Sequence, residues 1–148
     1  MSNLNEQFMR RAINLGENVR NKTGDNPWVG CVIVNNGKVI GEGYTHPVGG
    51  PHAEVHAIKD AEDKGFSLAG STLYSTLEPC SFHGRTPSCA KKIVEKEISH
   101  VVIAIRDPHP KVNGRGINIL KAGGVKVTEG IEDYTVRQSL KEWLRAFE

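Results

Sequence analysis

Three residues that can bind a metal ion are spread over one stretch of the chain, and they restrict the folds it can adopt. His52 opens a His-Ala-Glu sequence, Cys80 follows a proline, and Cys89 comes after eight intervening residues. One imidazole and two thiolates suit zinc, and three protein ligands leave the fourth tetrahedral position to water. We therefore expect a fold that brings these side chains together into a catalytic Zn²⁺ site. Glu54 lies beside the histidine, where a reaction that transfers protons needs a carboxylate.

The order of these residues is more informative than any one of them. A lone buried cysteine is usually a small packing residue, whereas H-x-E followed by P-C and a second cysteine is the signature of zinc deaminases that act on nucleobases. Zinc lowers the pKa of a bound water from 15.7 to about 7. The expected reaction replaces a ring amine by a carbonyl, and we assign Glu54 as the catalytic group that moves the protons. His56, one turn after His52, is interpreted as structural.

Length and composition favour one ordinary globular domain over residues 1–148. Of the 148 residues, 38% are hydrophobic and 24% are charged, and the net charge of +2 gives little support for a broad nucleic-acid-binding face. The first residues are polar and no long apolar run follows, so neither export nor a membrane span is predicted. We expect a cytoplasmic protein. Three cysteines, an odd number, suit metal ligands and a packed thiol better than a disulfide framework.

The periodicity predicts helices that alternate with strands after an opening hairpin. Cys31 falls inside the first expected strand, where we interpret it as a buried thiol in preference to a fourth ligand. The expected fold class is α/β, a three-layer α/β/α sandwich with a mixed sheet of about five strands. Helices are predicted over 4–19, 53–64, 88–96, 117–122 and about 140–147, and strands over 29–34, 38–44, 71–76, 100–105 and 125–128.

Several longer motifs resemble the pyrimidine deaminase of riboflavin biosynthesis, of the cytidine-deaminase-like superfamily. They are Asp25-Asn26-Pro27-Trp28-Val29-Gly30-Cys31-Val32, Gly50-Pro51-His52-Ala53-Glu54, Thr76-Leu77-Glu78-Pro79-Cys80-Ser81, Gly84-Arg85-Thr86-Pro87, Asp107-Pro108 and Gly114-Arg115-Gly116. The eight residues between the cysteines separate this family from cytidine and tRNA deaminases. The resemblance spans about residues 8–130.

The resemblance implies a substrate, a site and partners. The substrate would be a diaminopyrimidinone with a ribosylamino or ribitylamino phosphate. His52, Cys80 and Cys89 would hold zinc, and Glu54 would shuttle protons. The family tends to associate, which implies a homo-oligomer, and a reductase domain often shares its chain; since nothing follows Glu148, we expect the reductase to be a separate polypeptide. The implied substrate contacts are Asn26, His46, Arg85, Asp107 and His109.

Two loops depart from the family pattern and leave the exact substrate open. Phe82 stands where the family usually has a histidine, with His83 one place later, and His109 replaces an asparagine. Ribosyl and ribityl substrates therefore both remain candidates. Arg85, Lys111 and Arg115 are candidate phosphate ligands, and Arg85 is the one that we favour.

Two other functions remain open from the sequence. One is a deaminase that acts on another nucleobase, nucleoside or antibiotic intermediate. The other is a non-enzymatic binding module in which zinc only stabilises the fold, and it requires a fourth protein ligand, for which His83 is close enough to be considered.

Overall fold

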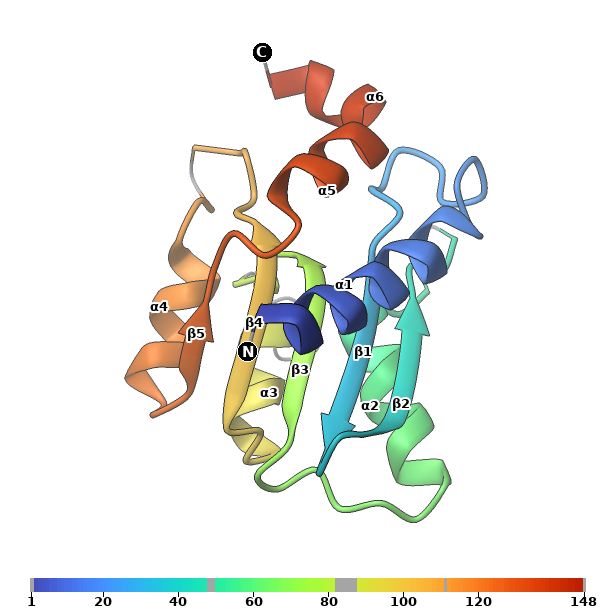
Figure 1. Ribbon diagram of the computed structural model, residues 1–148. Coiled ribbons are helices and arrows are strands. Elements are labelled where there is room, and N and C mark those ends of the chain that lie inside the picture. Colours follow the sequence, from blue (N-terminus) through green and yellow to red (C-terminus); the bar gives the residue numbers. More distant parts are fainter. Residues whose placement is uncertain (1, 48–49, 82–87, 111, 148) are drawn as a thin grey trace.

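A mixed sheet of five strands forms the middle layer of the molecule (Figure 1). The computed structural model describes residues 2–47, 50–81, 88–110 and 112–147. The strand order is β2-β1-β3-β4-β5; β1 pairs antiparallel with both neighbours, whereas β3, β4 and β5 run parallel. The strands are β1 (Gly30–Asn35), β2 (Lys38–Tyr44), β3 (Thr72–Leu77), β4 (His100–Ile105) and β5 (Lys126–Thr128).

Helices cover both faces of this sheet. Helices α1 (Ser2–Glu17) and α5 (Asp133–Ser139) pack on one face, and α2 (Ala53–Asp63), α3 (Cys89–Glu95) and α4 (Arg115–Ala122) lie on the other (Figure 1). The chain closes with α6 (Lys141–Leu144) and the 3-10 turn η1 (Arg145–Phe147), which lie beyond the carboxyl ends of β3 and β4. The predicted three-layer α/β/α sandwich with a mixed five-stranded sheet is confirmed.

The central strands are buried on both sides, as their continuous apolar runs predict. Cys31, Val32 and Ile33 of β1 are 0% exposed. Helix α1 approaches β1 so closely that a Cβ at Gly30 would lie 1.6 Å from the carbonyl oxygen of Ala12, so only glycine fits there.

The C-terminal segment corrects one prediction. The apolar positions from Leu140 to Phe147 predicted a single closing helix, but Leu140 has φ −93° and ψ 11° and separates α5 from α6. Helix α5 was not predicted, because Asp133–Ser139 has few apolar residues and buries only Val136. Within the described ranges, no helix is both long enough and apolar enough to cross a membrane.

Candidate active site

The structure brings His52, Cys80 and Cys89 together at the ends of three elements. His52 is the N-cap residue of α2, Cys80 follows β3, and Cys89 is the first residue of α3. Their ligand atoms all lie within 4.8 Å of one another, and Nδ1 of His52 is 3.3 Å from Sγ of Cys89. The fold places the three predicted ligands in one cluster because strand β3 and the two helix starts meet at the same edge of the sheet.

This donor set fits zinc. With Zn–S of about 2.3 Å and Zn–N of about 2.0 Å, a tetrahedral ion separates its ligand atoms by roughly 3.4 to 3.8 Å, which the cluster already approaches. Backbone contacts hold the two sulfurs in place: the Cys89 N–H donates to Sγ of Cys80 (3.2 Å), and the Ala90 N–H donates to the Cys80 carbonyl (3.1 Å). The Ser88 hydroxyl caps α3 by accepting from the Lys91 N–H (3.2 Å).

The two thiols differ in acidity. The pKa of Cys80 falls to about 4, chiefly because the Cys89 thiol donates a hydrogen bond to its sulfur, and the contact with His52 adds to this effect. The same bond, together with burial, raises the pKa of Cys89. The contact with Cys80 raises the pKa of His52, and the charge of Glu54 contributes. Zinc binds cysteine as thiolate, so a cation bound at this cluster would displace the thiol protons of both sulfurs.

Glu54 is buried beside this cluster, in the first turn of α2. Glu54 is 5% exposed. Burial raises the pKa of its carboxyl group to about 7, and the negative charge of Cys80 acts in the same direction. A carboxyl group with a pKa near neutrality can both accept and return a proton at physiological pH. Glu54 therefore has the environment that a proton-transfer group requires.

A cavity opens over the cluster and has a volume of about 190 Å³. This is below the range of about 300–1,000 Å³ that is usual for drug-sized ligands, so it suits one small ring, with the rest of a larger substrate outside. His52, Glu54 and Cys80 line it together with two predicted substrate contacts, Asn26 and Asp107. The other lining residues are Pro27, Val29, Thr45, Ala53, Leu77, Glu78 and Trp143.

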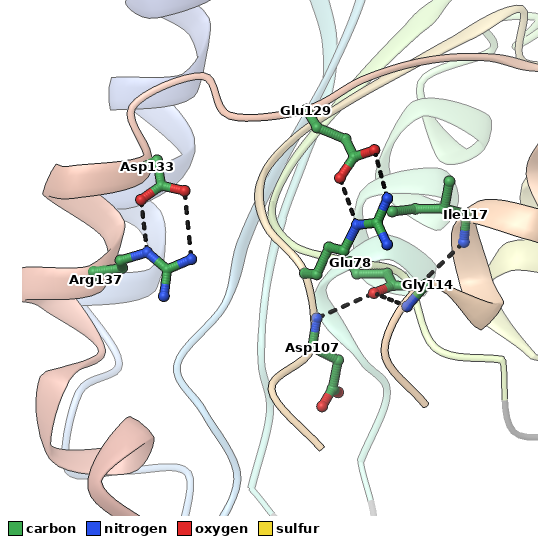
Figure 2. A network of polar contacts seen from close by, with 8 residues as sticks. Glu78, Asp107, Gly114, Ile117, Glu129, Asp133 and Arg137 are labelled. Carbon is green, nitrogen blue, oxygen red and sulfur yellow. Dashed lines mark hydrogen bonds and ion pairs between the residues drawn. The ribbon is translucent and has the colours of Figure 1, made fainter. Parts of the chain in front are cut away.

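Glu78 fixes the loop that carries Asp107 (Figure 2). Its buried carboxylate accepts backbone N–H bonds from Asp107 (3.1 Å), Gly114 (3.0 Å) and Ile117 (3.2 Å). A Cβ at Gly116 would lie 2.0 Å from the Pro79 carbonyl oxygen, so only glycine permits the first turn of α4 to pack against the backbone next to Glu78. The Asp107 side chain accepts from the His109 N–H (2.9 Å), and burial raises its pKa.

His46 belongs to a second cluster, next to His56. The Tyr44 backbone N–H donates to Nδ1 of His56 (3.1 Å), so that nitrogen carries no proton. Nε2 of His46 lies 3.1 Å from the same atom. The His46 ring also stacks on Tyr44, with centroids 5.3 Å apart. His56 thus holds His46 and the end of β2, in agreement with a structural role.

The remaining predicted residues lie at varying distances from the cavity. Within the part of the chain that the structure describes, His46 and His109 are not among the cavity-lining residues; His109 packs against Phe147, with ring centroids 6.1 Å apart. Arg115 is exposed at the start of α4. Phe82, His83, Arg85 and Lys111 fall outside the described residues, so their predicted roles stay predictions.

Glu78 and Trp143 are among the cavity residues that were missed from the sequence. Glu78 stands within a quoted motif, and its position directly before Pro79 and Cys80 was the available signal. Trp143 was assigned to packing, because its spacing fits an apolar helix face. Cys31, by contrast, lies in β1 as expected; burial raises its pKa, and it is not a member of the ligand cluster found among the described residues.

Residues 2–105 match the family described as the cytidine and deoxycytidylate deaminase zinc-binding region. Among curated proteins, the chain is 44% identical over 140 residues to riboflavin biosynthesis protein RibD of Escherichia coli, which covers 95% of this chain and 37% of that protein. It is also 44% identical over 147 residues to RibD of Chlamydia pneumoniae, of which it covers 38%. The chain therefore spans less than two fifths of the length of these relatives.

Solved structures show the same similarity. Acinetobacter baumannii RibD superposes with a TM-score of 0.92 and 39% identity, over 99% of this chain and 40% of that one. The diaminohydroxyphosphoribosylaminopyrimidine deaminase/5-amino-6-(5-phosphoribosylamino)uracil reductase of Thermotoga maritima gives a TM-score of 0.89 and 40% identity, over 99% and 42% of the two chains. Both likenesses extend past residue 105, so they include the C-terminal helices.

Proposed function

Because the chain belongs to the cytidine and deoxycytidylate deaminase zinc-binding family, we propose that it hydrolyses the amine of a diaminopyrimidinone ribosylamino or ribitylamino 5′-phosphate in riboflavin biosynthesis. The products are the corresponding aminouracil and ammonia. The observation that carries this proposal is the convergence of His52, Cys80 and Cys89 beside buried Glu54 in one small cavity. The similarity to RibD proteins supports the choice of pyrimidine.

The protein groups divide the chemistry between binding and proton transfer. His52, Cys80 and Cys89 would hold zinc, which supplies a nucleophile at neutral pH by lowering the pKa of water. Glu54 accepts the proton that the attacking water loses and delivers it to a ring nitrogen. It then takes the remaining proton of the added hydroxyl group, as the carbonyl forms, and passes it to the departing amine, so that one carboxyl group serves as base and acid in turn.

The substrate ring would occupy the cavity, with its sugar phosphate outside. Asn26 and Asp107 offer an amide and a carboxylate for ring substituents, since both line the cavity. We assign the outer part of the substrate to His46, Arg85 and His109, and we favour Arg85 as the phosphate ligand because a guanidinium pairs well with phosphate. This division follows from the cavity volume of about 190 Å³.

We place this activity in the cytoplasm, on one zinc-dependent deaminase domain that associates as a homo-oligomer. All three cysteines are free, which fits a reducing compartment.

The test is an assay of the zinc-loaded protein with both pyrimidine phosphates, beside cytosine, cytidine, guanine and adenosine. We expect ammonia release and the mass change of amine to carbonyl for one or both pyrimidine phosphates. The Glu54→Gln protein, purified in the same way, controls for contaminating deaminases. Turnover of only another base would replace the proposed substrate. Zinc bound by four protein ligands, with no turnover of any compound, would favour the binding module.

A further inference from the structure

Trp143 is an aromatic wall of the cavity that comes from outside the family's matched region. It lies on α6 and lines the same cavity as His52, Glu54 and Cys80. Among the lining residues that the structure describes, Asp107 and Trp143 are the two that follow residue 105, where the match to the deaminase family ends. The part of the cavity next to His52, Glu54 and Cys80 thus comes from the matched region, whereas Trp143 comes from the C-terminal residues that follow it.

Two contacts between distant parts of the chain hold α6 at the cavity. The indole Nε1–H of Trp28 donates to the Ser139 carbonyl (3.1 Å), just before α6. The Arg20 guanidinium pairs with the Glu142 carboxylate and lies over the Trp28 ring, 5.3 Å from its centroid. Trp28 stands between Pro27 and Val29, which both line the cavity, so these contacts join α6 to another part of the cavity wall.

The Trp143 ring has an aromatic neighbour from η1. Phe147 packs edge-on against it, with centroids 5.1 Å apart and an interplanar angle of 61°. Phe147 in turn contacts His109, on the loop that carries Asp107. Phe147 thus links the Trp143 ring to the loop that carries Asp107.

We propose that Trp143 is a specificity-determining residue whose indole contacts the flat ring of the substrate. This inference rests on the proposed function, and it adds the group that selects a planar heterocycle. A cavity that admits one small ring leaves the ring faces as its largest apolar surface, and base–aromatic stacking contributes about 1–3 kcal/mol in proteins that bind bases. Asn26 and Asp107 then hydrogen-bond to the polar edge of the substrate ring, while the Trp143 indole packs against one face of that ring.

The test compares Trp143→Ala and Trp143→Phe with wild type in steady-state kinetics. We expect Trp143→Ala to raise KM about tenfold or more with kcat changed less than about threefold, because a contact present in both ground and transition states is lost. Trp143→Phe, which keeps an aromatic face, should stay within about threefold in KM. Tyr134→Ala is the matched control, since Tyr134 is an aromatic of the neighbouring helix that is 76% exposed. An unchanged KM in Trp143→Ala would overturn the inference.

A fluorescence titration provides a readout that does not depend on turnover. In the Glu54→Gln background, binding of the pyrimidine phosphate should quench tryptophan emission, and adding Trp143→Phe should remove that quench while Trp28 remains. A quench that persists undiminished would contradict the inference. If wild type deaminates only another base of the panel, the proposed function fails, and the same variants titrated with that base still decide the role of Trp143.

Discussion

Glu54 combines burial with a position in the first turn of α2, next to the histidine of the ligand cluster. We predict that Glu54→Gln lowers kcat by about 10²- to 10⁴-fold, because an amide cannot accept and return the proton. Zinc content should stay at the wild-type level, since Glu54 is not a member of the His52, Cys80 and Cys89 cluster. Ammonia release and metal analysis on the same preparation measure both quantities.

The matched control lies on the same helix. Glu62 is an exposed carboxylate whose side chain is 43% accessible and pairs with Lys96 (2.6 Å), so Glu62→Gln should leave kcat within about twofold. Full turnover by Glu54→Gln protein that retains zinc would exclude the proton-transfer role.

The three cysteines separate into ligands and a packing residue. Cys31 is 0% exposed in β1, whereas Cys80 and Cys89 share the cluster with His52. We predict that Cys80→Ala loses bound zinc and activity, while Cys31→Ala keeps one zinc per chain and loses only about 1 kcal/mol of stability. Colorimetric zinc analysis and thermal melting provide the measurements. Loss of zinc from Cys31→Ala would instead identify Cys31 as a fourth ligand.

At the scale of elements, Glu78 joins β3 to the loop before α4 (Figure 2). Its carboxylate accepts three backbone N–H bonds, which the single oxygen of a glutamine amide cannot all accept. We predict that Glu78→Gln destabilises the fold by about 1–3 kcal/mol and lowers the melting temperature by about 2–10 °C. KM should rise more than kcat falls, because the loop carries Asp107 and no ligand of the cluster.

Glu129 provides the control for this network. It pairs with the exposed Arg106 side chain (2.7 and 3.0 Å), and such surface pairs contribute about 0–1 kcal/mol. Glu129→Gln should therefore leave both KM and the melting temperature close to wild type. Equal effects of the two substitutions would mean that Glu78 contributes no more than a surface charge.

The elements show what could be predicted from the sequence. The strands and α2 were placed to within one or two residues, because continuous apolar runs, turn glycines and an Asn-Asn-Gly hairpin are local signals. The break at Leu140 was not predicted, since its apolar spacing with Trp143 fits an uninterrupted helix. The position of α6 depends on the bonds from Trp28 to Ser139 and from Arg20 to Glu142, which join residues 111 and 122 positions apart. No local pattern encodes such a contact.

The residues of the candidate site likewise fall into those that the sequence predicted and those that it did not. His52, Glu54, Cys80 and Cys89 were predictable because their chemistry restricts the residue types and their order. The cavity walls from Leu77 and Thr45 could not be predicted, since any apolar or small residue could stand there. The place of Trp143 in the cavity could not be predicted because it depends on the long-range contacts of α6. Residue types and their order thus determine the chemistry of the site, whereas the packing of distant parts of the chain determines the shape of its cavity.

At the scale of the whole molecule, a zinc ion bound by His52, Cys80 and Cys89 would link parts of the chain that the sheet already brings close. Its ligands come from the start of α2, the end of β3 and the start of α3. A ligand that binds only the folded state stabilises it, by about 4.1 kcal/mol at a thousandfold excess over the dissociation constant. Zinc bound at this cluster should therefore be a large part of the stability of the domain.

We predict that removing zinc with a chelator lowers the melting temperature of wild-type protein by about 8–16 °C, given about 2–4 °C per kcal/mol for a domain of this size. Addition of zinc should restore it. The Cys80→Ser protein should melt near the metal-free wild type, and the chelator should not change its melting temperature further. Because the sheet and its helices share one apolar core, the metal-free protein should still unfold cooperatively. Wild-type protein that loses all its zinc without any change in melting temperature would show that the cluster does not couple metal binding to folding.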